Sequence, residues 1–282
     1  MMNRLWQQIG GWSLHLALLG VLTSGVLEGA PRSNKSGQQA KAKDLAPEKS
    51  DHANYFSENR QGIPPEKLKA ADMLRVQTIS SIQKLLETPN LNSNKKFELY
   101  LRLGEIHSER SEYLRDLEMK DYEQRYDQWL KSGKKGADPV LNTKNSQAEL
   151  LKSTEAFRKL VREFPKHPRT DAALYSLAKT MLLLENDNAV LYFNQLVKEH
   201  PNSTLLPDTY LALGEYYFFK HDMEKAKDNY KLAMNFKESR VYPFAIYKLG
   251  WAHYNSKSID EKNTQENINK AIAAFKLAIK IS

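Results

Sequence analysis

One residue pattern recurs about every 36 residues in this chain, and it limits the possible folds more than any other feature. A large residue, a leucine and a small residue are followed, after a turn, by a small residue, an aromatic ring and another small or apolar residue. The clearest copies are Tyr210, Leu213, Gly214, Tyr217, Ala226, Tyr230 and Ala233; Ile246, Leu249, Gly250, Ala271, Phe275 and Ala278; and Leu174, Leu177, Ala178, Ala189, Phe193, Leu196 and Pro201. This spacing predicts pairs of helices. Because one helix pair cannot bury its apolar face alone, such pairs stack into an extended, curved solenoid.

A weaker copy lies earlier in the chain. Its first half is Tyr100, Leu103 and Gly104, and its second half is Ser153, Phe157, Leu160 and Pro165. Residues 108–146 are inserted between these halves, and the last repeat has about nine extra residues around 256–265. We expect each small residue to let the second helix approach the first, and each aromatic ring to fill the space between repeats.

The sequence therefore predicts an all-α fold, a helix-pair solenoid with an N-terminal helical extension and a long helical insertion. The expected helices are 64–87, 94–131, 147–164, 170–184, 187–199, 206–219, 222–236, 241–255 and 265–281, with prolines at their boundaries. The expected segments are 1–30 as signal peptide or anchor, 31–62 as polar linker, 63–146 as N-terminal helices with the insertion, and 147–282 as repeats.

Two apolar stripes have more than one interpretation. The later part of the long helix carries Tyr113, Leu117, Tyr122, Tyr126, Trp129 and Leu130. This stripe packs back on the first helix, or it forms an arm that docks a partner, since such rings serve cores and interfaces alike. The last helix still carries Ile272, Phe275 and Ile279 where a solenoid usually has a polar cap. The chain therefore pairs through that end, or it is a fragment of a longer array.

The pattern resembles the tetratricopeptide repeat (TPR), well over 147–282 and more weakly over 95–107. In TPR arrays the first helix of each repeat lines the concave face. The resemblance implies a partner-binding groove of Tyr175 and Lys179 in one repeat, Leu211, Glu215, Phe218 and Phe219 in the next, and Tyr247, Trp251, Tyr254 and Asn255 in the last. Such an aromatic-rich groove suits an apolar or extended peptide. The alternative is that several of these rings are buried between repeats or under the insertion.

No residue pattern indicates a chemical site. The sequence contains no phosphate-cradling glycine loop and no nucleophile elbow. The absence of cysteine removes disulfides, zinc–thiolate sites and a lipoprotein anchor, and the seven histidines show no metal-ligand spacing. The net charge of +8 is spread over helices that also carry acids, which is typical of solvated faces. We therefore expect a non-enzymatic protein with no cofactor, no metal and no nucleic acid, whose partners are proteins.

The N-terminus predicts export. Arg4 precedes an apolar stretch at 11–22 that is short for a membrane span, and Thr23 and Gly25 offer small residues for cleavage. The alternative is an uncleaved inner-membrane anchor, in which case this segment is the only part to contact a membrane. Either way the sequence predicts a periplasmic body.

Four segments together resemble exported TPR proteins of myxobacteria and predatory bacteria, including gliding-motility components of the Glt/Agl type; they are 100–106, 113–119, 207–218 and 240–251. This resemblance implies a periplasmic scaffold of a cell-envelope complex. More distantly, the chain is similar to the TPR proteins of outer-membrane β-barrel assembly and of Tol–Pal coordination. A second hypothesis is therefore a chaperone for outer-membrane clients. A third, a platform that assists peptidoglycan cleavage, needs a carboxylate in a deep cleft.

Overall fold

The computed structural model describes residues 63–256 and 261–281, and every secondary-structure element in these ranges is a helix. The predicted signal segment and linker lie outside the described residues. The helices are α4 (Pro65–Leu86), α5 (Ser93–Lys131), α6 (Lys144–Glu163), α7 (Thr170–Leu183), α8 (Ala189–Glu199), α9 (Leu206–Phe219), α10 (Met223–Met234), α11 (Tyr242–Tyr254) and α12 (Glu261–Ile281). The predicted all-α fold is confirmed, and α6 begins at Lys144, so the expected division at 146/147 falls inside this helix.

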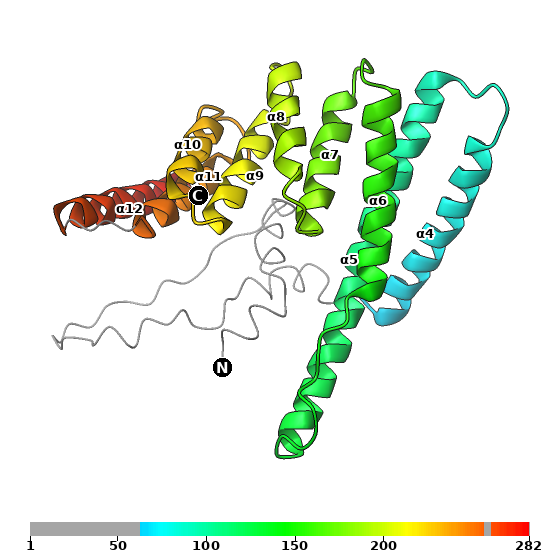
Figure 1. Ribbon diagram of the computed structural model, residues 1–282, viewed down its shortest axis with the longest axis horizontal. Coiled ribbons are helices and arrows are strands. Elements are labelled where there is room, and N and C mark those ends of the chain that lie inside the picture. Colours follow the sequence, from blue (N-terminus) through cyan, green and yellow to red (C-terminus); the bar gives the residue numbers. More distant parts are fainter. Residues whose placement is uncertain (1–62, 257–260, 282) are drawn as a thin grey trace.

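Each helix packs on the next along the chain, from α4 through to α12, which gives the row of helices seen in Figure 1. Prolines lie where the sequence analysis expects them. Pro65, Pro207 and Pro243 occupy the first turns of their helices, where a missing N–H has no intrahelical acceptor to lose. The side chain of Asn92 caps α5, because its oxygen accepts the backbone N–H of Asn94 at 2.9 Å.

The small-residue and aromatic positions of the repeat meet as pairs. A Cβ added to Gly104 would lie 2.6 Å from the ring of Phe157. The equivalent contacts are 2.5 Å from Gly214 to Tyr230 and 2.6 Å from Gly250 to Phe275. The hydroxyl of Ser153 also donates to the Gly104 carbonyl at 2.7 Å. The early, degenerate copy is therefore a genuine repeat, formed by the first half of α5 and by α6.

Replacing Gly214 with alanine should destabilise the protein by about 1–3 kcal/mol, because the buried ring of Tyr230 must move to admit a methyl group. We expect a smaller loss for Gly250→Ala, since its partner Phe275 is only half-buried. Urea-induced unfolding measures both variants. No loss in either variant, or a gain in stability at Gly214, would show that the rings do not set the approach of the helices.

The insertion is an arm formed by the second half of α5 and the chain that returns from it. In Figure 1 this half of α5 extends beyond the ends of α4 and α6. Gly133 and Gly136, both at positive φ, turn the chain at its tip. The returning segment is held by backbone acceptors, because the Arg125 guanidinium donates to the Val140 carbonyl at 3.2 and 3.3 Å and the Trp129 indole N–H to the Gly136 carbonyl at 3.4 Å.

The far end of the aromatic stripe of the arm does not pack back on α4, which was the first of its two interpretations. The apolar contacts of α4 are with the first half of α5, where Ile79 and Ile82 pack with Leu103 and Ile106. Farther along the arm, the rings of the stripe contact one another; the centroid distances are 5.9 Å for Tyr122–Tyr126 and 5.6 Å for Tyr126–Trp129. The far end of the stripe is thus part of the arm rather than of a bundle with α4.

Candidate protein-docking groove

The ten residues predicted to line the groove lie on three successive first helices of repeats. Tyr175 and Lys179 are on α7; Leu211, Glu215, Phe218 and Phe219 are on α9; Tyr247, Trp251 and Tyr254 are on α11, which Asn255 follows directly. Their exposure differs strongly from one helix to the next. The positions nearest the C-terminal end are the accessible ones.

An aromatic cluster on α11 and α12 is the most accessible part of the predicted groove, and we call it the ring cluster: Tyr247, Trp251, Tyr254 and Phe275. The Trp251 ring lies 6.2 Å from Tyr247, 5.8 Å from Tyr254 and 5.5 Å from Phe275 between centroids. Trp251 is 38% exposed and Tyr254 is 58% exposed, whereas Tyr247 and Phe275 are half-buried. Neighbouring rings therefore hold an exposed tryptophan in place at the surface, at little further entropic cost on binding.

Two residues of the predicted groove lie inside the solenoid. Leu211 and Glu215 are only 4% and 8% exposed. The Glu215 carboxylate accepts the phenol O–H of Tyr230 at 2.5 Å and the ammonium of Lys248 at 2.8 Å. The prediction that these side chains face an open groove is wrong, because Leu211 belongs to the hydrophobic core and the Glu215 carboxylate pairs with Lys248 of the next repeat. Burial and the nearby carboxylate both raise the pKa of Tyr230 well above its ordinary value.

The other predicted residues of α7 and α9 are half-buried. Tyr175 packs edge-on against the Phe193 ring at 5.9 Å, and burial raises the pKa of its hydroxyl. Lys179, Phe218 and Phe219 are likewise half-buried, so the alternative that rings are covered holds in part for this stretch. The accessible part of the predicted groove is therefore the end of α11 with the residue after it, at Trp251, Tyr254 and Asn255.

The sequence analysis missed two half-buried tyrosines that follow Glu215 directly on α9. Tyr216 and Tyr217 contact each other edge-to-face at 5.2 Å, and the ammonium groups of Lys220 and Lys225 lie 5.6 and 5.2 Å from their rings. Tyr217 belongs to the repeat pattern and was assigned only a structural part. The pair of adjacent tyrosines followed by lysines is the signal that could have identified them.

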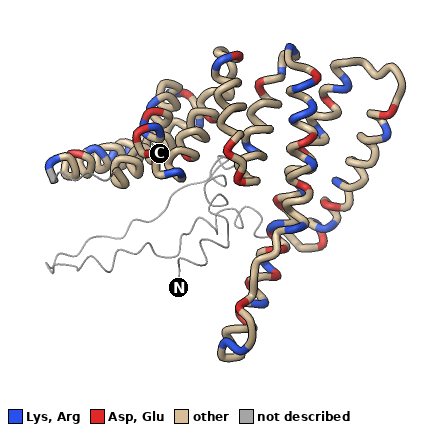
Figure 2. The backbone as a smooth tube through the Cα atoms, in the orientation of Figure 1, with Lys and Arg blue, Asp and Glu red and all other residues tan. Residues whose placement is uncertain are grey.

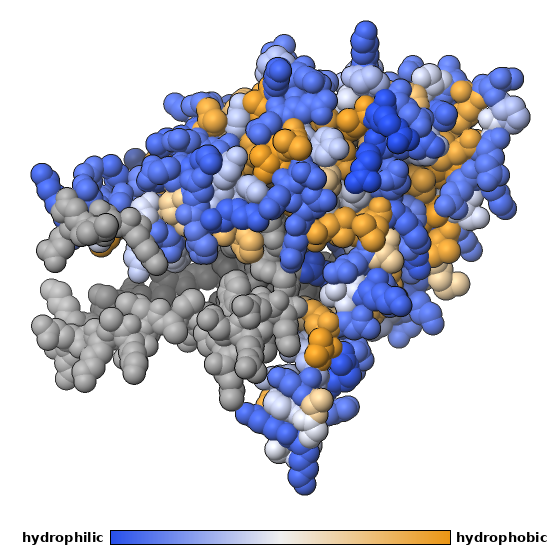
Figure 3. Space-filling view, viewed as in Figure 1, coloured by the Kyte–Doolittle hydropathy of each residue, from blue (hydrophilic) through white to orange (hydrophobic). Residues whose placement is uncertain are grey.

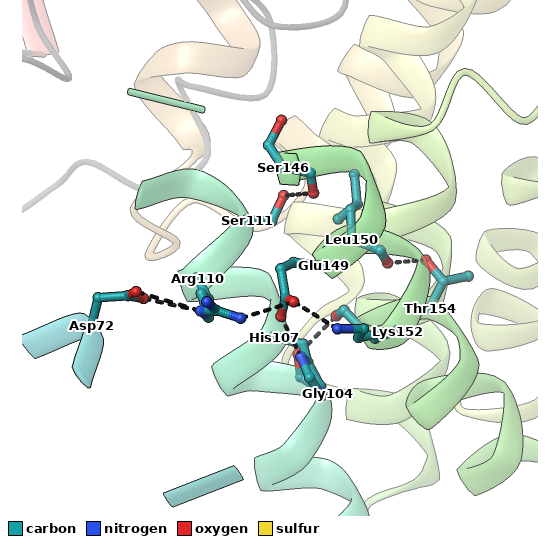
Figure 4. A network of polar contacts seen from close by, with 11 residues as sticks. Asp72, Gly104, His107, Arg110, Ser111, Ser146, Glu149, Leu150, Lys152 and Thr154 are labelled. Carbon is teal, nitrogen blue, oxygen red and sulfur yellow. Dashed lines mark hydrogen bonds and ion pairs between the residues drawn. The ribbon is translucent and has the colours of Figure 1, made fainter. Parts of the chain in front are cut away.

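A buried ion cluster joins α4, α5 and α6 (Figure 4). The Glu149 carboxylate contacts the His107 ring nitrogen at 2.7 Å, the Arg110 guanidinium at 2.9 Å and the Lys152 ammonium at 2.8 Å. Arg110 also contacts Asp72 at 3.2 Å. Burial alone would raise the pKa of Glu149, but the hydrogen bonds from His107 and Lys152 and the charge of Arg110 outweigh it and lower the pKa to about 2. Every group in this cluster has an oppositely charged or hydrogen-bonding neighbour, so it serves the packing of the three helices.

The base of the arm holds a shallow cleft of about 480 Å³, which the sequence did not predict. It is lined by Leu141, Asn142, Thr143, Lys144, Gln147, Ala148 and Leu151. The Glu118 carboxylate fixes this corner, because it accepts the backbone N–H groups of Asn145 and Ser146 at the start of α6. The lining contains no acid or histidine, and its one ionisable side chain is Lys144.

The charges along the helices give no further site. Lys, Arg, Asp and Glu are interspersed along most of the helices in Figure 2. Two described helices carry one sign alone, but with few charges: α9 has Asp208 and Glu215, and α11 has Lys248, which pairs with Glu215. Within residues 63–256 and 261–281, no group of three or more His, Asp or Glu side chains could hold a metal ion. None of the helices in the same ranges is long and apolar enough to cross a membrane.

Parts of this chain are similar to known proteins. A family model described as a tetratricopeptide repeat matches residues 172–203, which span α7 and α8. This chain contains a tetratricopeptide repeat within its helix-pair solenoid. A solved structure entitled "Crystal structure of MamA" is similar to this chain with a TM-score of 0.43 and 17% identity, over 72% of this chain and 89% of that chain. No curated protein matches the chain. Stacked repeats of this kind form extended concave surfaces that bind other proteins.

Proposed function

We propose that the chain is a non-enzymatic periplasmic scaffold that holds proteins of a cell-envelope complex along the groove of its solenoid. The observation that carries the proposal is the ring cluster, in which Trp251 is exposed on a support of half-buried rings. Tryptophan and tyrosine are the residues that most often dominate binding energy at interfaces. A groove with exposed rings and a buried carboxylate favours an apolar or extended segment over an acidic chain terminus.

The cell-envelope setting comes from the sequence. The apolar segment at 11–22 behind Arg4 supports export, and the resemblance to exported TPR proteins supports a complex such as that of gliding motility. The second candidate function is a chaperone or assembly factor for outer-membrane clients. Its support is the exposure of the rings at the end of α11, since Trp251 and Tyr254 are 38% and 58% exposed and aromatic rings accept many apolar segments.

A peptide array separates the two candidates. Purified chain is applied to short extended peptides drawn from envelope proteins, and bound chain is detected on each spot. A scaffold should bind few peptides, with one sequence motif in common, whereas a chaperone should bind many apolar peptides weakly. If the folded chain binds none of these peptides, the groove is not a peptide-binding site.

Trp251→Ala should weaken binding of the selected peptides by about 30-fold or more, the usual loss for a central aromatic anchor. The variant should stay folded, because Trp251 is partly exposed and its loss costs about 1–2 kcal/mol. Leu232→Ala is the matched control, since Leu232 is 39% exposed on α10 and lies outside the predicted groove. Fluorescence anisotropy of a labelled peptide measures all three proteins. Equal affinity for Trp251→Ala and for the native chain would contradict the assignment.

A further inference from the structure

The end of the arm carries a group of lysines with no acidic residue among them. Residues 128–137, which we call the arm tip, contain Lys131, Lys134 and Lys135 and neither Asp nor Glu. All three lysines are exposed, and none of their ammonium groups pairs with an acidic side chain within the described part of the chain. The charge of the arm tip is therefore available to an anionic surface outside the protein.

An equally dense group of basic residues on α6 shows the contrast. Arg158, Lys159 and Arg162 also fall within five residues, but each has an acidic neighbour on the same helix. Arg158 pairs with Glu155 at 2.7 Å, and Lys159 and Arg162 lie 3.9 and 3.7 Å from Glu163. The basic residues of the body are thus neutralised locally, whereas those of the arm tip are not.

The charge of the arm also changes along its length. Its shaft, residues 117–127 of α5, contains four acids and two bases, and in Figure 2 both signs occur along the shaft whereas basic residues mark its far end. Glu123 lies about 12 Å before Lys131 along the helix axis, at about 1.5 Å per residue. Charges are screened over about 8 Å at physiological salt. A charged surface that meets the arm end-on therefore interacts with the lysines much more strongly than with most of the shaft acids.

The acid that follows the tip belongs with the shaft. Burial, and after it the charge of Asp138, raise the pKa of Tyr122, which lies nine residues before Lys131 on α5. The Asp138 carboxylate thus acts on the shaft as the chain returns. Asp127 lies one turn before Lys131, so the basic character is confined to the turn itself.

Apolar side chains lie among these lysines. Leu130 is 42% exposed, and the half-buried Trp129 ring is held at the turn, where its N–H donates to the Gly136 carbonyl at 3.4 Å. The Lys134 ammonium lies 5.8 Å from the centroid of this ring. Indole rings and the long stems of lysine are both suited to a boundary between water and lipid, because each has an apolar body and a polar end.

The position of the tip favours a flat partner over a protein cleft. The arm extends past the ends of α4 and α6 in Figure 1, so its turn forms a convex end that a broad surface can reach without contacting the solenoid. Anionic lipid headgroups provide such a surface, and they attract each nearby lysine by about 1 kcal/mol.

We propose that the arm tip binds an anionic membrane surface, with its three lysines at the lipid phosphates and with Trp129 and Leu130 at the level of the headgroups. The proposal is independent of the ring cluster. It adds a second point of membrane contact to the N-terminal segment considered in the sequence analysis. Binding at the tip holds the solenoid away from the membrane by the length of the arm, so that the groove stays open to proteins.

A fluorophore at the tip of the full chain tests the proposal. Because the chain has no cysteine, Ala137→Cys accepts a single environment-sensitive label beside the lysines, and Asn202→Cys accepts one between α8 and α9 as the control position. Vesicles of phosphatidylglycerol should shift the emission of the label at position 137 to the blue, and vesicles of neutral phosphatidylcholine should shift it far less. The label at position 202 should not respond, and about 0.5 M salt should reverse the shift at position 137.

Two triple variants with the same change in net charge, each carrying the label at position 137, separate the tip from the charge of the whole chain. The tip variant is Lys131→Gln, Lys134→Asn and Lys135→Gln, with asparagine at position 134 because its φ of 62° is left-handed. It should need about 100-fold more phosphatidylglycerol for the half-maximal shift, about fivefold for each charge. The control is Lys225→Gln, Lys231→Gln and Lys270→Gln, three exposed lysines that have acidic partners. It should change the midpoint less than about twofold. Both variants keep residues 1–62, so any contribution of the apolar segment at 11–22 is common to them.

Circular dichroism shows that both variants keep their helices. Equal weakening by the two variants would overturn the proposal, because net charge alone would then explain the binding. No shift at position 137 with phosphatidylglycerol, or an equal shift with phosphatidylcholine, would also overturn it. A shift with polyglutamate and none with either vesicle would overturn it in favour of an acidic protein partner.

Discussion

Glu215→Ala should lower the free energy of unfolding by about 3–5 kcal/mol, the usual cost of removing one partner of a buried ion pair. The substitution leaves the ammonium of Lys248 buried without its 2.8 Å carboxylate contact and removes the acceptor of the Tyr230 hydroxyl. Because Glu215 is on α9 and Lys248 on α11, the loss also weakens the junction between two repeats. Chemical denaturation followed by circular dichroism gives the value.

Two further variants make this prediction specific. Asp187→Ala removes an exposed ion pair with Lys220, at 2.8 Å, and should cost no more than about 1 kcal/mol. The double variant Glu215→Leu with Lys248→Met replaces the buried pair by apolar side chains of similar size and should regain most of the loss. A Glu215→Ala loss as small as that of Asp187→Ala would mean that Glu215 is solvated, as the groove prediction first supposed.

The contribution of Glu149 to the free energy of unfolding should disappear in acid. Its pKa falls from the ordinary 4.5 to about 2 on folding, so the carboxylate stabilises the native state fully above about pH 5. Between about pH 4.5 and pH 2 the unfolded state binds a proton at this carboxyl and the native state does not. The unfolded state is therefore favoured as the pH falls, and this contribution, about 2–3 kcal/mol, is lost. The difference in unfolding free energy between the native chain and Glu149→Gln should therefore be large at pH 7 and shrink towards pH 2.

The matched control is Glu155→Gln on the same helix, α6. Glu155 is exposed and pairs with Arg158 at 2.7 Å, so its difference from the native chain should stay within about 1 kcal/mol across the same range. A Glu149→Gln difference that does not change with pH would contradict the low pKa, and with it the close contacts of Glu149 with His107, Arg110 and Lys152.

The repeat geometry could be predicted because it rests on local spacing. Small and aromatic residues at fixed steps place Gly214 against Tyr230 and Gly250 against Phe275, and prolines mark the helix starts. Even the copy split by the insertion was recoverable, since Gly104 and Phe157 keep their places within the pattern. Helix boundaries were accordingly close along most of the described chain.

The missed features depend on contacts between distant residues. The residues near Glu215 in the sequence do not indicate its contact with Lys248, which lies 33 residues later. His107 and Glu149, which also contact each other, are 42 residues apart in the sequence. The arm is held mainly by backbone carbonyls, which leave no mark in the side-chain pattern. Amphipathic spacing also predicts which face of a helix is apolar, but it does not predict what covers that face. Met73 and Leu74 of α4 are both exposed, and apolar surface is visible over the region of α4 in Figure 3.

The most direct test of the scaffold proposal is photo-crosslinking in living cells. A photoreactive amino acid is placed at Trp251, and at Leu232 as the exposed control, and the adducts are identified by mass spectrometry. The account predicts one or two dominant envelope proteins at position 251 that are absent at position 232. Many outer-membrane proteins at position 251 would favour the chaperone. No adduct there, from a folded and abundant chain, would contradict the groove as a docking surface.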